Sequence, residues 1–379
     1  MRKKQKRAIL YGLGCSLLAM QAAHAMNGPT SIEIDGGPLG PLQLSGGVDG
    51  YAYAETGTGN ASILGQAGHD NGVNLDTALV QLQKTTGILQ FNLEIGPYGG
   101  MPTLGAPPQK ATVNFFRASP FYLGYLTIAP PDSPVTISVG QLPGLEGYEG
   151  LTWGNANLFA TDIFFVENAP SVGVSANYQH GPVSVTVTFG DGWDTRVFNF
   201  VQALATYTIN PTNNVDVFYG GNMGKTGLNA ITYNQTPVRT FGAYYMNSQM
   251  FGAWYSYTRG NLGVVPEVQY VYAKVDHAVG IDKFTSNLGA AMFVDYGFGS
   301  SPYSLGGMVE YFTSNGPSDW FIAPHAEGVG FEVTPTWQYK NLFARVSAGY
   351  IHLLNGGAYG NDGNGTNTFQ SGLQGGILF

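Results

Sequence analysis

The chain has 379 residues, of which 55 are glycine, and only 11% of its residues are charged. An average soluble domain has about 25% charged residues, so this composition leaves too few charges to cover the surface of a soluble protein of this size. The formal net charge is −8, and an acidic balance argues against a nucleic-acid binder, which needs a basic surface.

The N-terminal segment 1–25 is expected to be a signal peptide. Five basic residues within positions 2–7 precede an apolar run at 8–20, and Ala23-His24-Ala25 is a small-x-small cleavage site. The apolar run is too short for a transmembrane helix, which needs about 20 residues. Cleavage would leave 11 basic and 24 acidic residues, a formal charge of −13, and would remove the single cysteine, Cys15. A disulfide framework and a thiolate metal site are thereby excluded.

A short periplasmic lead-in at 26–41 precedes 42–379, which we expect to form one transmembrane domain. No stretch after residue 25 is a long uncharged apolar run, so transmembrane helices are excluded. Instead, apolar and polar residues alternate in segments of about 9–11 residues, the length of a tilted membrane strand. The segment 89–95 is an example, with Leu89, Phe91 and Leu93 on one face and polar residues between them.

The connections separate a membrane barrel from a soluble β-sandwich, which shows the same alternation. Short connections such as 85–87, 180–182 and 339–341 alternate with longer Gly/Asn/Ser-rich ones such as 56–74 and 355–367. Short periplasmic turns and long external loops are typical of bacterial outer-membrane barrels. We therefore predict an all-β, antiparallel transmembrane barrel of about 16 strands, with 12 to 18 acceptable because the partition of 239–258 is open. The strands are predicted to begin near residues 42, 75, 87, 114, 135, 170, 183, 200, 215, 240, 264, 284, 303, 327, 341 and 369.

Aromatic pairs near the predicted strand ends suggest girdles at the membrane interfaces, although the β propensity of tyrosine could also explain them. The pairs are Tyr51 and Tyr53, Tyr122 and Tyr125, Tyr244 and Tyr245, and Tyr270 and Tyr272. The chain ends in Phe379, which shares its strand face with Ile377. A terminal aromatic on an amphipathic strand resembles the signal read by the barrel-assembly machinery. We expect that machinery, periplasmic chaperones, and outer-membrane lipid and lipopolysaccharide as partners.

The connection 142–169 is the strongest candidate for a functional loop. It contains aromatic and acidic residues that suit a loop folded into the lumen, where it would narrow the channel and set a negative field; an external loop with solvated charges is the alternative. These residues are Glu146, Tyr148, Glu149, Trp153, Asp162 and Glu167. Arg345 is placed in the lumen by the strand alternation, and Arg117 is a weaker lumen-facing candidate.

Around this connection the sequence resembles the OmpL-like β-barrel porins of Gram-negative outer membranes. The resemblance is carried by Val139-Gly140, Gly147-Tyr148-Glu149, Pro170, Gly173 and Gly190-Asp191-Gly192-Trp193-Asp194. The family often has a basic residue after the strand-ending glycine, whereas this chain has Gln141, which leaves the selectivity of the constriction open. The resemblance implies a porin-type channel without enzymatic residues.

From these patterns we expect an outer-membrane porin for passive diffusion of small hydrophilic solutes or ions, with mild cation preference and no cofactor. A substrate-specific channel for sugars or small acids is one alternative, and a non-conducting structural or adhesin barrel is another. A homo-oligomer is left open. An enzyme is not expected, because the sequence has no His-Glu-x-x-His or Gly-x-Ser-x-Gly motif and its histidines are scattered.

Overall fold

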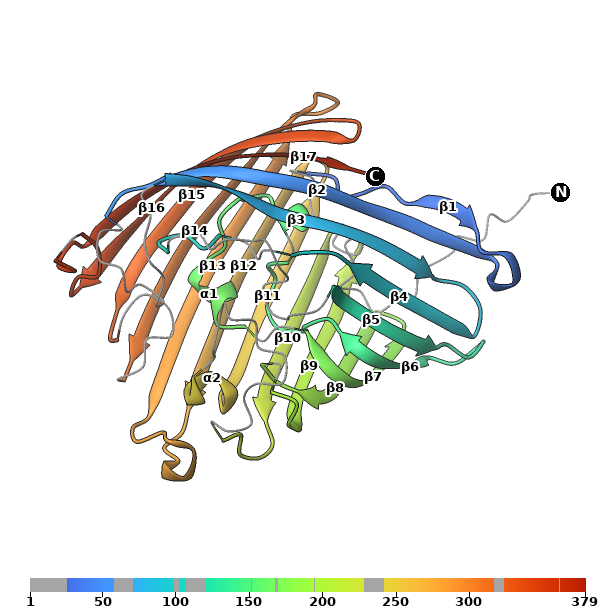
Figure 1. Ribbon diagram of the computed structural model, residues 1–379, viewed down its shortest axis with the longest axis horizontal. Helices are drawn as coiled ribbons and strands as arrows, with labels where there is room; N and C mark the ends of the chain where they lie inside the picture. Colours follow the sequence, from blue (N-terminus) through green and yellow to red (C-terminus); the bar gives the residue numbers. More distant parts are fainter. Residues whose placement is uncertain are drawn as a thin grey trace.

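The computed structural model describes residues 26–57, 71–98, 102–106, 120–150, 152–167, 170–193, 195–227, 242–316, 324–360 and 362–379. Strands β2 to β17 form one closed antiparallel barrel of 16 strands, each paired with its neighbours in sequence, and β17 pairs with β2 to close the ring (Figure 1). The predicted fold class and strand number are confirmed. The signal segment 1–25 and Arg117 lie outside the described residues.

The wall strands carry the following bounds: β2 Pro41–Glu55, β3 Asn71–Lys84, β4 Leu89–Ile95, β5 Phe121–Ile128, β6 Val135–Leu142, β7 Ser171–His180, β8 Val183–Asp191, β9 Phe198–Asn210, β10 Asn213–Asn222, β11 Gln249–Arg259, β12 Leu262–Ala273, β13 Thr285–Gly297, β14 Tyr303–Asn315, β15 Glu327–Tyr339, β16 Leu342–Asn355 and β17 Asn367–Leu378. The predicted starts agree within four residues except at β5 and β11. Before β11, residues Ala243–Met246 form the short helix α2, so the stretch that was too long for one strand is a helix followed by a strand.

The connections alternate in length as predicted. Two residues separate β7 from β8, where Gly181 takes a positive φ of 57°, and two residues separate β15 from β16. The long connections, including those after β6 and β10, all leave from the opposite end of the barrel (Figure 1). Among the described residues, no helix is long and apolar enough to cross a bilayer.

The alternation predicted from sequence sets the two faces of the wall. In β15, Glu332 and Thr334 are buried toward the lumen, while Phe331 and Val333 are exposed on the outside. An apolar outer face and a polar interior are what a barrel in lipid requires, because the outer side chains meet hydrocarbon.

One of the aromatic pairs faces outward, as the girdle interpretation requires. Tyr270 and Tyr272 lie on the outer face of β12, in contact with the exposed Phe251 and Phe284. The girdle interpretation is wrong for Tyr51, Tyr53, Tyr122 and Tyr125, which are buried, and for Tyr245, which packs on Trp193. Tyr51 and Tyr53 share their strand face with the lumen-facing Asp49 and Glu55, so proximity to a strand end could not reveal their orientation.

The two ends of the chain meet on the edge of β2. Phe379 and Gly46 exchange two backbone hydrogen bonds of 2.9 and 2.7 Å, which continue the β17–β2 ladder. Within the predicted lead-in, the four-residue strand β1 (Ile32–Asp35) pairs with residues 41–44 of β2, just beyond Phe379. Strands β17 and β1 therefore lie end to end along one edge of β2.

Candidate pore and its inner loop

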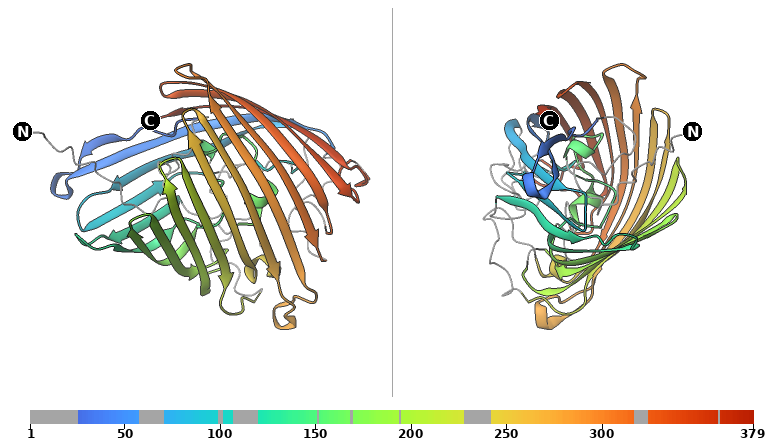
Figure 2. Two further views of the ribbon diagram at one scale, coloured as in Figure 1. Left: turned by 180° about the vertical axis from the view of Figure 1, so that it is seen from behind. Right: turned by 90° about the vertical axis from the view of Figure 1, so that its right-hand side faces the viewer.

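The connection between β6 and β7 lies inside the ring of strands (Figure 2). It contains the 3-10 turn η3 (Thr152–Gly154) and the short helix α1 (Asp162–Phe165), whose first turn is capped by the hydroxyl oxygen of Thr161, which accepts from the amide of Phe164. Trp153 and Asp162 are at most 1% exposed. We call residues 143–167 the inner loop. Their burial inside the ring of strands agrees with the inward placement expected from the sequence.

Carboxylates of the wall hold the main chain of the inner loop. Glu332 in β15 accepts hydrogen bonds from the amides of Leu158 (3.0 Å) and Phe159 (3.1 Å). Glu310 in β14 accepts from the amide of Asp162 at 2.8 Å, and Glu267 in β12 accepts from that of Tyr148 at 3.0 Å. Four hydrogen bonds to three wall strands therefore fix the course of the loop.

Arg345 lies on the lumen face of β16, as predicted from the alternation. Its guanidinium donates to the carbonyl oxygen of Asn155 at 2.9 Å and to Gln374 Oε1 at 2.5 Å. The amide group of Gln374 in turn donates to Asp49 and to Asp76. The one basic side chain that is buried in the described part of the chain is therefore surrounded by a polar network around the middle of the inner loop.

Glycines on the wall make room for the inner loop. A Cβ at Gly306 would lie 2.5 Å from the carbonyl oxygen of Ala156, and one at Gly289 would lie 2.8 Å from Ile163. A Cβ at Gly372 would overlap Leu158, and one at Gly47 would meet Trp153 at 2.9 Å. Since interiors are close-packed, these positions explain part of the high glycine content.

The four acidic residues of the inner loop are all buried. Glu149 accepts hydrogen bonds from the amide and hydroxyl of Thr161, and Glu167 occupies the space beside Gly147, whose φ is +75°. Glu146 lies against Gly220 of β10.

Burial also governs the charge of these loop carboxyls. It raises the pKa of Glu149 to about 8, assisted by the nearby charge of Glu332 and opposed by the hydrogen bonds from Thr161. Burial and neighbouring carboxylates hold the pKa of Glu167 well above its ordinary value, and burial raises that of Asp162 to about 7. Near neutral pH Glu149 is therefore largely protonated and Asp162 is about half protonated, so the negative field expected from the loop acids is reduced.

Two further connections reach the lumen, which the sequence did not reveal. In the β4–β5 connection, Leu104 is fully buried and its amide donates to the carbonyl oxygen of Ala160 in the inner loop at 2.8 Å. Tyr359, from the β16–β17 connection, is fully buried and donates to the carbonyl oxygen of Gly105. Both connections were expected to be external loops. Their few apolar residues have no regular spacing in the sequence, so nothing predicted that they would be buried in the lumen.

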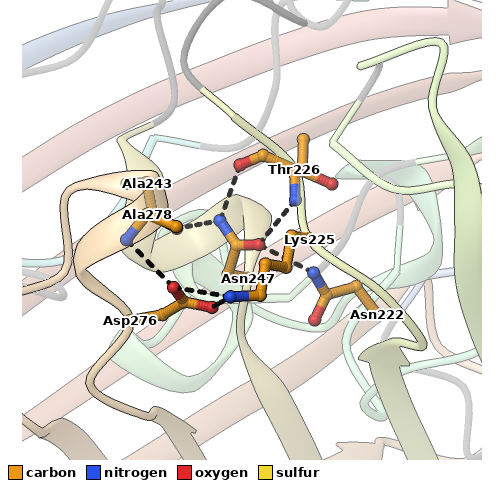
Figure 3. Close-up of polar contacts among 7 residues, drawn as sticks. All are labelled: Asn222, Lys225, Thr226, Ala243, Asn247, Asp276 and Ala278. Carbon is orange, nitrogen blue, oxygen red and sulfur yellow. Dashed lines mark hydrogen bonds and ion pairs between the residues drawn. The ribbon is translucent and has the colours of Figure 1, made fainter.

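At the loop end of the barrel, a polar cluster joins the β10–β11 connection to the β12–β13 connection (Figure 3). The Asn247 side chain donates to the carbonyl oxygen of Thr226 at 2.9 Å and accepts from its amide at 2.8 Å. Lys225 forms an ion pair of 2.7 Å with Asp276, and the Asn222 side chain also donates to Asn247. These bonds brace the rim of the pore.

A cavity lies between the inner loop and strands β12 and β13. Tyr148, Glu149, Asn155 and Asn157 of the loop line one side of it. The opposite side is formed by Gly263, Val265, Phe293 and Asp295, and Met26 also contributes. Because it borders both loop and wall, it is the candidate passage past the inner loop.

Solved structures with the same fold are outer-membrane proteins. The anion-selective porin from Comamonas acidovorans has a TM-score of 0.56 at 9% identity, covering 89% of this chain and 99% of that one. The outer membrane channel DcaP of Acinetobacter baumannii has 0.56 at 12%, covering 89% and 97%. The trimer form of OmpT, an outer membrane protein of Vibrio cholerae, has 0.54 at 11%, covering 89% and 99%. No protein of curated function matches the sequence.

The sequence itself matches a family model over almost the whole barrel. The match extends over residues 41–379, which includes every wall strand and the inner loop. This extends the local resemblance at 139–194 to the full domain and confirms the outer membrane as the location of the barrel. The chain belongs to the OmpL-like family described as beta-barrel porin-2.

Proposed function

We propose that the protein is a diffusion channel for small hydrophilic solutes and ions. The observation that carries the proposal is the inner loop, which crosses a polar lumen and is bonded to Glu267, Glu310 and Glu332 of the wall. A loop held in this way narrows a channel to a fixed size without the need for a cofactor or a catalytic group. The constriction residues are those of the loop, with Arg345 opposite them.

The distribution of charge supports a mild preference for cations. Of the 24 acidic residues, at least 14 are buried inside the barrel, and ten of these lie on wall strands. In the described part of the chain, Arg345 is the one basic side chain buried among them. More than half of the acidic residues therefore lie inside the barrel. The wall thus contributes more acidic groups to the lumen than the inner loop does.

Swelling of proteoliposomes tests the diffusion proposal. Vesicles that contain the folded protein should swell in isotonic arabinose and much less in the larger stachyose. Vesicles with heat-denatured protein are the control. Equal rates with arabinose and its enantiomer favour simple diffusion, whereas a clear preference for one sugar favours a substrate-specific channel. No swelling with any solute would favour a closed structural or adhesin barrel.

A homo-oligomer is part of the proposal. Strands β4 (7 residues), β5 (8) and β6 (8) are shorter than the 9–11 residues of a membrane-crossing strand. The exposed large apolar side chains of the described parts of β2–β6 are aliphatic apart from Phe121, whereas exposed tyrosines lie on later strands, such as Tyr207 and Tyr296. A wall too short for lipid and without interfacial tyrosine suits contact with a second copy.

Cysteine cross-linking tests this contact. A cysteine in place of Ile137 on β6 should cross-link copies in the membrane, and one in place of Val309 on β14 should not. Monomeric behaviour of both variants would reject the oligomer and leave the channel proposal intact. Lipid, lipopolysaccharide and the assembly machinery are the remaining proposed partners.

A further inference from the structure

The cavity beside the inner loop combines features that the passage of small ions does not require. It has a volume of about 20 Å³ and opens to solvent between residues 148–157 and the lumen faces of β12 and β13. Its lining brings together two aromatic rings, two carboxyls and two side-chain amides, from Tyr148, Phe293, Glu149, Asp295, Asn155 and Asn157.

The aromatic side is an ordered cluster. The rings of Tyr148 and Phe293 lie 5.2 Å apart between centroids, and Tyr148 also lies 6.4 Å from Trp254, which in turn lies 5.6 Å from Phe218. Aromatic faces attract cations, and flat cations such as guanidinium also stack on them.

Acidic side chains lie next to these rings. Burial raises the pKa of the Tyr148 phenol, and the carboxylates of Asp295, Glu267 and Glu149 raise it further, which places all three acids around one ring. The guanidinium of Arg345 bonds to Gln374, which donates to Asp49 and Asp76, and to the main-chain oxygen of Asn155.

Asn157 adds a buried hydrogen-bond acceptor to the cavity. Its side chain is 3% exposed, and its Oδ1 has no hydrogen-bond partner among the described residues. The neighbouring Asn155, by contrast, is satisfied on both sides by Gly150. A buried carbonyl oxygen without a donor is costly, so a ligand with an N–H group would find it ready.

We propose that this cavity is a binding site for small organic cations of the guanidinium type, which stack on Tyr148 and Phe293, pair with Asp295 and donate to Asn157. The inference rests on the proposed channel function and assigns a solute class to it. A planar ion with N–H donors meets all three features, whereas K⁺ meets only the charge. Bound in the passage, such a cation would slow the flow of other ions.

The test uses methylguanidinium, with N-methylurea as its neutral planar counterpart, added to single channels in 0.1 M KCl. Methylguanidinium should block the K⁺ current of the wild type at millimolar concentration, and N-methylurea should not. Asp295→Asn and Tyr148→Leu should each raise the half-blocking concentration by about five-fold, the effect of losing one charge or one cation–π contact. Tyr148→Phe, which keeps the ring, should retain the block.

Two control variants are matched to the site. Tyr296→Leu changes the residue next to Asp295 on the outer face, and Asp282→Asn removes an exposed carboxylate in the β12–β13 connection. Methylguanidinium should block both variants at the same concentration as the wild type. A channel that conducts K⁺ but ignores methylguanidinium would overturn this inference and leave the diffusion proposal intact. If the protein does not conduct, calorimetric binding of methylguanidinium to the folded protein in detergent decides the site by itself: binding that Asp295→Asn weakens supports it, and no binding refutes it.

Discussion

The indole nitrogen of Trp153 donates a hydrogen bond of 2.9 Å to Asp49 Oδ1. This bond joins the middle of the inner loop to β2, which is a different wall strand from β12, β14 and β15, where the main chain of the loop is bonded. The loop is therefore fastened to four wall strands, and its position depends on side chains that are far apart in sequence.

Trp153→Phe should loosen this attachment. The variant keeps most of the apolar volume but removes the N–H donor, and a hydrogen bond to a charged group contributes about 1.5–3 kcal/mol. We expect a higher unit conductance and more open-channel noise, with the heat-modifiable barrel retained. Trp337→Phe on the outer part of β15 is the matched control. Indistinguishable single-channel records for the two variants would mean that the bond does not hold the loop.

Two adjacent glycines of β14 offer a sharper comparison. Gly306→Ala would force its Cβ against the main chain of Ala156, so the loop must move, and such overpacking costs about 1–3 kcal/mol. At Gly307 the nearest atom to a Cβ is 3.8 Å away, and Gly307→Ala should change stability by less than about 0.5 kcal/mol. The free energy of unfolding measured in urea and the unit conductance should both differ between the two variants. Equal behaviour would show that the wall glycines do not fit the loop.

The sequence predicted those features that follow from the regular alternation of apolar and polar residues. Alternation placed the strands, the lumen face and Arg345, and the aromatic content of 142–169 pointed to an inward loop. It could not predict which wall residues hold that loop, because the contact between Glu332 and Leu158 joins residues 174 positions apart with no repeating pattern. Nor could it distinguish Gly306, which receives the loop, from Gly307, which faces open space.

The raised pKa of Glu149 gives a pH dependence with a defined sign. Below a pH of about 8 the carboxyl is protonated and neutral, and above it the group is ionised and adds negative charge to the passage. The cation/anion permeability ratio should therefore rise between pH 6 and pH 9. Glu149→Gln should lower the ratio at pH 9 and change it little at pH 6, while the exposed Asp282→Asn should leave the profile unchanged. A flat wild-type profile would contradict ionisation of Glu149 in the passage.

Deletion of Phe379 should reduce the yield of folded protein in the membrane several-fold. The deletion removes the hydrogen bonds with Gly46 that complete the β17–β2 seam. Conductance per inserted channel should not change, because the backbone bonds of Phe379 are made to Gly46 of the wall. Val346→Ala, on the outer face of the neighbouring strand β16, is the control for loss of apolar surface. Normal yield after deletion would show that the terminal residue is not needed for assembly.

The central claim is a narrow aqueous passage with a negative interior. The most direct measurement is the reversal potential of single wild-type channels across a ten-fold KCl gradient at pH 7. The account predicts steady conductance with a reversal potential of the sign that marks K⁺ as more permeant than Cl⁻. Inserted, heat-modifiable protein that conducts nothing, or a potential of the opposite sign, would contradict it.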